Sequence, residues 1–155
     1  MIRQSISAAL TAAMKARDAE RVAALRLVQA ALKNRDIEAR TGDAPADDDA
    51  LVIEVLQKMA KQRRESIEMY RAGGRDDLAA REAFELAVIE GFLPAQLDDA
   101  AAEAAIAAIA ARVGATGPKD MGALMTAVKA ELAGQVDMSR ASRLARAVLE
   151  ARATG

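Results

Sequence analysis

The sequence predicts an all-α protein, with an N-terminal helical domain followed by a small three-helix tail domain. Apolar residues recur with the 3.6-residue period of an α-helix through most of the 155 residues. Sustained alternation of polar and apolar residues is missing and β-branched residues are sparse, so strands are not expected. A hydrophobic content of 52% is enough to bury a core, and the chain is therefore expected to fold.

The N-terminal helices are predicted from apolar stripes and from the residues that begin or end them. Met14 belongs to the first apolar stripe, and Phe84 is a candidate for burial on the fourth helix. Asp18 can cap the second helix, and Gly73-Gly74 ends the third. The segment 41–49 (TGDAPADDD) combines Gly, Pro and four Asp, which is typical of a loop whose last aspartates favour the start of the next helix. The four helices are expected over about residues 2–17, 18–40, 50–72 and 76–91.

A domain boundary is predicted at Pro94, because proline disfavours helical geometry in the residue before it. The chain then divides into residues 1–94 and residues 95–155. Three helices are expected in the second part: from Asp98 or Asp99 to Gly114, from Met121 to Leu132, and from about Asp137 onward.

The composition excludes several classes of enzyme. The chain has no His and no Cys, which removes thiol enzymes, serine hydrolases of the histidine type and His/Cys metal sites. Gly73-Gly74 lacks the Lys-Ser/Thr that follows in a phosphate-binding loop, and Asp47, Asp48 and Asp49 are explained by helix capping. The sequence therefore predicts no catalytic site, no metal and no cofactor.

Location and membrane contact are predicted from apolar runs. Residues 1–16 have apolar side chains at helical spacing and no uninterrupted apolar run of seven or more residues, which is unlike a signal peptide. The other apolar stretches are rich in Ala and interrupted by charges, so no membrane-spanning helix is expected. A cytoplasmic protein without a membrane partner is the prediction.

Short segments spread in order along nearly the whole chain form a recognisable set: MKARD at 14–18, RL at 26–27, AALKN at 30–34, KQRRES at 61–66, FLPAQL at 92–97, GAT at 114–116 and KDMG at 119–122. With these segments the chain resembles the YqeY-like proteins of the GatB/YqeY family. The second half, residues 95–155, also resembles the tail domain of the GatB subunit of the glutamine-dependent amidotransferase that acts on misacylated tRNA.

The resemblance implies an all-α protein whose tail domain is associated with holding tRNA. The family label also implies carbon-nitrogen ligase activity with glutamine as the amide donor. In the larger amidotransferase, amide transfer and ATP chemistry occur on other domains, and this chain has no counterpart of those domains.

Basic residues of the second half are the candidate nucleic-acid contacts. From Arg112 onward seven basic and four acidic residues leave a net charge of +3. Three arginines step by three along the last predicted helix, and guanidinium groups can each donate two parallel hydrogen bonds to a phosphate. Charged residues on a solvent-facing helix side are the alternative explanation. The candidate residues are Lys119, Lys129, Arg140, Arg143 and Arg146.

Arg63 is predicted to form a structural ion pair. It lies in the middle of an apolar helix face, where an unpaired guanidinium would be costly, and Glu82, Glu85 or Glu90 could supply the carboxylate. The nearby Lys58 lies away from that face and is interpreted as a surface residue in ordinary ion pairs.

The leading functional hypothesis is a non-catalytic accessory protein that binds tRNA through the tail domain and is linked to glutamine-dependent tRNA amidation. A protein-protein adaptor that docks through an apolar face such as residues 121–132 is the second hypothesis. The third is a carbon-nitrogen ligase with glutamine as donor, as the family label implies.

Overall fold

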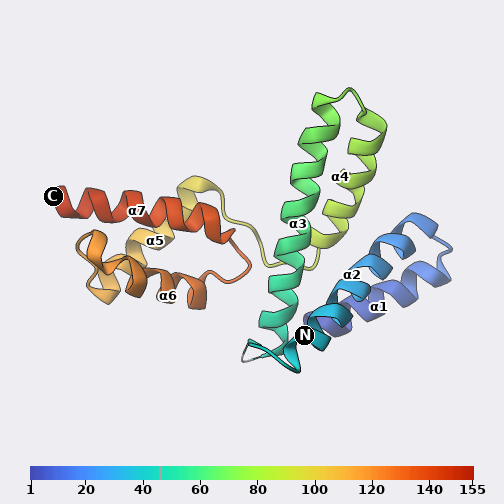
Figure 1. Ribbon diagram of the computed structural model, residues 1–155, viewed down its shortest axis with the longest axis horizontal. Coiled ribbons are helices and arrows are strands. Elements are labelled where there is room, and N and C mark those ends of the chain that lie inside the picture. Colours follow the sequence, from blue (N-terminus) through green and yellow to red (C-terminus); the bar gives the residue numbers. More distant parts are fainter. Residues whose placement is uncertain (46) are drawn as a thin grey trace. The chain divides into compact units, whose positions relative to one another are not determined.

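The computed structural model describes residues 1–45 and 47–155, and every regular element in them is helical, which confirms the all-α prediction. Seven α-helices and one 3-10 helix follow one another along the described residues (Figure 1). They are α1 (Ile2–Lys15), α2 (Ala19–Ala39), α3 (Asp48–Ala72), α4 (Asp76–Glu90), α5 (Asp99–Val113), η1 (Pro118–Asp120), α6 (Met121–Glu131) and α7 (Met138–Thr154).

The chain divides into two compact units, Met1–Leu93 (unit 1) and Pro94–Gly155 (unit 2). Unit 1 consists of two helical hairpins, α1 with α2 and α3 with α4 (Figure 1). Its apolar stripes meet in one core, as expected for amphipathic helices. The largest fully buried side chains there are Ile6, Leu25, Val28, Val52, Leu56 and Ile89.

Unit 2 has a separate core, built from α5, α6 and α7. The segment before α5 is held to the α6–α7 connection, because the Leu97 amide donates to the Gln135 carbonyl oxygen at 2.8 Å. The Gln96 side chain donates to the Gly134 carbonyl oxygen of the same connection. The largest fully buried side chains of this core are Ile106, Leu124, Val128, Val136 and Leu149.

Aspartates begin four of the helices as N-caps, each accepting a hydrogen bond from a backbone amide in the first turn. They are Asp18, Asp47, Asp98 and Asp137. The third helix begins at Asp48, two residues before the expected start. The loop predicted over 41–49 includes Ala46, which lies outside the described residues.

Two expectations about burial are wrong. Phe84 was expected in the core but is 37% exposed, because it shares the exposed side of α4 with Ala80 and Arg81. Met14 is exposed as well, although it was assigned to the apolar stripe of the first helix. Val88 takes a core position on α4 instead.

Candidate nucleic-acid interface

Arg140 is largely committed to the fold of unit 2. Its side chain is 29% exposed, and its Nη2 donates to the carbonyl oxygen of Leu97. Its Nε lies 3.4 Å from Oδ1 of Asp99, without hydrogen-bond geometry. The guanidinium therefore ties the start of α7 to the segment before α5, and only part of it is left for a phosphate.

Arg143 and Arg146 lie on the exposed side of α7. Arg143 is 68% exposed, and its Nη2 is 3.7 Å from Oδ2 of Asp99, which is a weak ion pair at the surface. Arg146 is exposed and forms no ion pair among the residues that the structure describes. These two guanidinium groups are one turn apart and open to solvent.

Lys119 and Lys129 lie on other elements of unit 2. Lys119 belongs to η1, which packs on α7, and Lys129 belongs to the last turn of α6. Both are exposed, and neither has an ion-pair partner within the described residues. The five predicted residues thus comprise four exposed cations and one, Arg140, that is used internally.

The segments at 114–116 and 119–122 have a structural role in this unit. The Asp120 carboxylate accepts hydrogen bonds from the Thr116 amide at 2.8 Å and the Gly117 amide at 3.3 Å. The Thr116 hydrogen bond is the main cause that lowers the pKa of Asp120 below its usual value, and the Gly117 amide adds to it. Arg152 Nε donates to the Ala115 carbonyl oxygen at 2.7 Å. These contacts hold the turn that carries Lys119.

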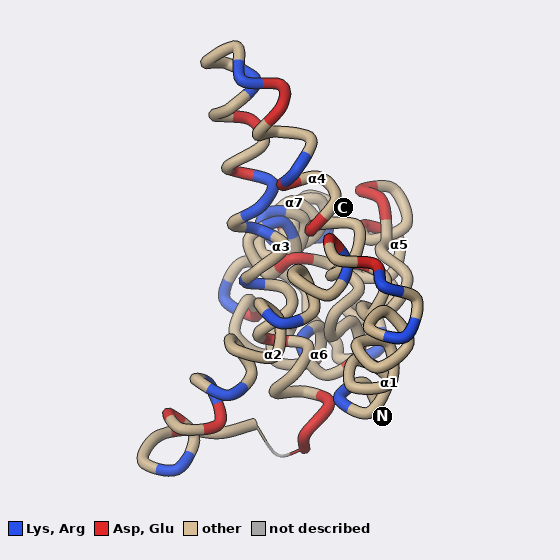
Figure 2. The backbone as a smooth tube through the Cα atoms, turned by 90° about the vertical axis from the view of Figure 1, so that its right-hand side faces the viewer, with Lys and Arg blue, Asp and Glu red and all other residues tan. Residues whose placement is uncertain are grey.

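In unit 1, Arg63 lies beside Glu85, one of the three glutamates considered as partners. The distance from Arg63 Nε to Glu85 Oε2 is 3.2 Å, and the side chains are 16% and 19% exposed. The pair joins α3 to α4. Figure 2 shows both basic and acidic segments along this hairpin. Residues 58–64 of α3 carry four cations and no acid, and the first acidic residue after them is Glu65.

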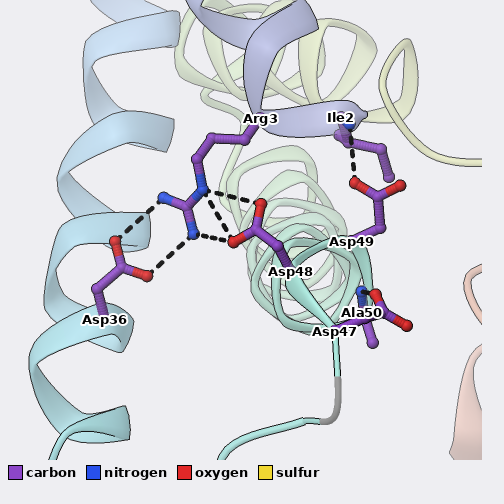
Figure 3. Close-up of polar contacts among 7 residues, drawn as sticks. All are labelled: Ile2, Arg3, Asp36, Asp47, Asp48, Asp49 and Ala50. Atoms are coloured by element: carbon purple, nitrogen blue, oxygen red, sulfur yellow. Dashed lines mark hydrogen bonds and ion pairs between the residues drawn. The ribbon is translucent and has the colours of Figure 1, made fainter.

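Sequence reasoning missed a charged cluster around Arg3. Its guanidinium lies between Asp36 of α2 and Asp48 of α3, with Nη2 at 3.0 Å from Asp36 Oδ1 and 2.8 Å from Asp48 Oδ1 (Figure 3). The Asp49 carboxylate accepts from the Ile2 amide at 2.9 Å. Only the three consecutive aspartates gave a signal in the sequence, and helix capping accounted for them.

The charges of this cluster stabilise one another. The hydrogen bonds that Arg3 donates to Asp48 hold the pKa of Asp48 below its usual value, and the bonds that Arg3 donates to Asp48 and Asp36 raise the pKa of Arg3. Both aspartates are more than a third exposed, so solvent screens the interaction. The cluster joins the starts of α1 and α3 to the end of α2.

The described residues contain no group of three or more acidic side chains placed to hold a metal ion. No single helix among them is long and apolar enough to cross a bilayer. Two successive helical segments, Asp99–Val113 and Pro118–Glu131, are together long and apolar enough to cross a bilayer by length and composition alone. They are bent by 92° relative to each other.

A family model for the Yqey-like proteins matches residues 3–149. Relatives include proteins named "Altered inheritance of mitochondria protein 41, mitochondrial" from three fungi. The Eremothecium gossypii protein is 37% identical over 86 residues, which cover 56% of this chain and 45% of that protein. The Candida glabrata protein is 33% identical over 84 residues, or 54% of this chain and 45% of the relative. The Saccharomyces cerevisiae protein is 32% identical over 84 residues, which cover 54% of this chain and 44% of that protein.

The matched region is thus less than half the length of each of these relatives. Their names place them in mitochondria, which contradicts the cytoplasmic location expected from the sequence. The expected likeness of residues 95–155 to the GatB tail domain stays a prediction.

Proposed function

Because the chain belongs to the Yqey-like protein family, we propose that it is a non-catalytic accessory protein that binds tRNA through unit 2, in connection with glutamine-dependent amidation. The observation that carries the proposal is the exposure of four cations on unit 2. Arg143 has only a weak ion pair, and Arg146, Lys119 and Lys129 have none among the described residues. Such cations are available to phosphates.

The proposed contact is with the RNA backbone. Unit 2 contains none of the three aromatic residues of the chain, Tyr70, Phe84 and Phe92, so bases cannot stack on aromatic rings there. Phosphate contacts release condensed counterions, and the affinity should therefore fall steeply as salt is raised. Little discrimination between tRNA species is expected, because backbone contacts do not report sequence.

The test is retardation of tRNA in a gel at several salt concentrations, with the unmodified protein and an Arg143→Ala/Arg146→Ala variant. We expect the slope of log affinity against log salt to become shallower by about one unit for each phosphate that the variant no longer binds. Arg26→Ala/Lys33→Ala is the matched control, because it removes the same charge from exposed positions on α2. The proposal would be contradicted if both variants reduced the salt slope equally, or if the unmodified protein did not retard tRNA at low salt.

Arg140 supplies a second control. Because it holds Leu97 and Asp99, Arg140→Met should lower the thermal stability of unit 2. Its effect on tRNA affinity should be smaller than that of the Arg143→Ala/Arg146→Ala variant. A larger effect on affinity without a decrease in stability would place the phosphate at Arg140 instead.

The protein-protein adaptor hypothesis relied on the apolar side chains of residues 121–132, which face the core of unit 2. Leu124, Val128 and Leu132 are buried in the core of unit 2, and Met121 and Met125 pack against it.

The carbon-nitrogen ligase alternative is tested by a glutaminase assay of the purified chain, in which turnover above buffer would overturn the non-catalytic proposal.

A further inference from the structure

Unit 1 contains an open polar cleft that the proposed function does not use. It has a volume of about 580 Å³ and lies between the C-terminal half of α2 and the middle of α3. Its apolar lining comes from Ala31, Val55 and Met59. The remaining lining is mostly charged or amide side chains, so the cleft suits a small ligand with a short aliphatic part and polar ends.

One end of the cleft is acidic. Arg35 is 18% exposed there and already neutralised, because its Nε is 3.1 Å from Glu54 Oε1 and its Nη2 donates to the Asp43 carbonyl oxygen at 3.0 Å. Glu38 and Asp43 also line the cleft, and no cation pairs with their carboxylates among the described residues. They leave negative charge that an ammonium group can neutralise.

The other end offers a cation and two amides. Lys58 follows Glu54 by one turn of α3, or about 6 Å along the axis, and Gln62 follows by one further turn. Contrary to the expectation of surface ion pairs, the Lys58 ammonium has no acidic partner in the described part of the chain. The Asn34 and Gln62 amides line the same cleft, also without hydrogen bonds to other described residues. A carboxylate can accept hydrogen bonds from all three side chains.

We propose that this cleft binds a small zwitterion of the ω-amino acid class, with its ammonium at Glu38 and Asp43 and its carboxylate at Lys58, Asn34 and Gln62. The extended chain of 4-aminobutyrate separates its nitrogen from its carboxyl carbon by about 5 Å, which is close to one helical turn. An α-amino acid separates them by only about 2.5 Å. Asn34 at one end of the cleft and Glu38 at the other are one turn apart on α2, or about 6 Å along the axis, and this spacing favours the longer zwitterion.

The sequence segments of the family resemblance meet at this cleft. Asn34 ends the segment at 30–34, which also contains Ala31, and Gln62 belongs to the segment at 61–66. Both amides are exposed and have no hydrogen-bond partner among the described residues, so both are open to a ligand in the cleft.

The test uses three probes of equal chain length on the full protein, followed by amide NMR shifts. These are 4-aminobutyrate, butylamine and butyrate, and glycine serves as the short zwitterion. We expect saturable shifts around the cleft with 4-aminobutyrate, and binding about tenfold weaker or more for each of the others, since each lacks either a charged group or the required spacing. Equal affinities for the four probes, or shifts that do not saturate, would overturn the proposal.

Lys58→Met keeps the aliphatic length and removes the ammonium. It should reduce 4-aminobutyrate binding to the level of butylamine and leave butylamine unchanged. Lys61→Met is the matched control, since Lys61 is an exposed lysine on the same helix that does not line the cleft. If Lys58→Met has no effect on 4-aminobutyrate, the proposed orientation is wrong. Should this variant fail to fold, the four probes still decide the question on the unmodified protein.

Discussion

Single charged residues have clearly different roles in the two units. The guanidinium of Arg3 satisfies two carboxylates from different helices, whereas Arg146 has no acidic partner among the described residues. A partner restricts a guanidinium to one geometry, and a free guanidinium remains available to an external anion. The type of residue is the same in both places, and the neighbours decide its use.

The Arg3 cluster gives a prediction about stability. Arg3→Met should lower the free energy of unfolding by roughly 1 kcal/mol near neutral pH, because the change removes two partly exposed ion pairs. Urea unfolding monitored by circular dichroism measures the change. Arg26→Met, at an exposed position without an ion pair in the described residues, is the control and should have almost no effect.

The loss of stability caused by Arg3→Met should depend on pH. Arg3 lowers the pKa of Asp48 below its ordinary value of 3.8. This stabilisation is fully present above the unfolded-state pKa and disappears as the pH falls through the lower, folded-state pKa. The penalty of Arg3→Met should therefore be constant between about pH 7 and about pH 5 and shrink as the pH drops below about 4. A penalty independent of pH would contradict the assigned role of Asp48.

At the scale of an element, the ends of helices follow from local chemistry. Aspartate N-caps start α2, α3, α5 and α7. Gly114 ends α5 with φ of +72°, in the left-handed region that other residues enter only with strain. The sequence predicted this helix end because glycine is the residue that adopts the conformation at least cost.

Two glycine substitutions in unit 2 should have opposite effects. Gly114→Ala should lower the free energy of unfolding by about 1 kcal/mol, because of the left-handed backbone alone. No atom lies within 4 Å of a Cβ added there. A Cβ added at Gly122 on α6 also meets no atom within 4 Å. Gly122→Ala should raise the free energy of unfolding by about 0.5 to 1 kcal/mol, because alanine favours a helix. Thermal unfolding of the two variants gives the comparison, and changes of equal sign would contradict it.

At the scale of the whole molecule, each unit has its own core. The buried residues of unit 2 come from α5, α6, α7 and their connections, and those of unit 1 come from α1 to α4. The segment before α5 is fastened within unit 2 by Leu97 and Gln96. Cooperative folding of a small helical unit requires such a separate core.

Residues 94–155 should therefore fold when produced alone. We expect a helical circular dichroism spectrum and a cooperative thermal transition, at modest stability because small domains bury a smaller fraction of their surface. A fragment beginning at residue 100 is the control, since it lacks the segment that bonds to the α6–α7 connection and to Arg140. This shorter fragment should be less stable than the 94–155 fragment. A disordered 94–155 fragment would contradict the prediction.

The sequence by itself determined the helices, most of their ends and the all-α class, because helical periodicity, aspartate caps and glycine stops act within a few residues. It also pointed to Arg63 as a cation on an apolar helix face that needs an acidic partner. Only the tertiary structure decided which acid that is, that Phe84 is exposed, and that Arg140 is bound internally while Arg143 and Arg146 are not. Arg3 contacts side chains 33 and 45 residues away, and the polar cleft forms where α2 meets α3. Such contacts depend on how helix faces pack together, which periodicity along one helix does not specify.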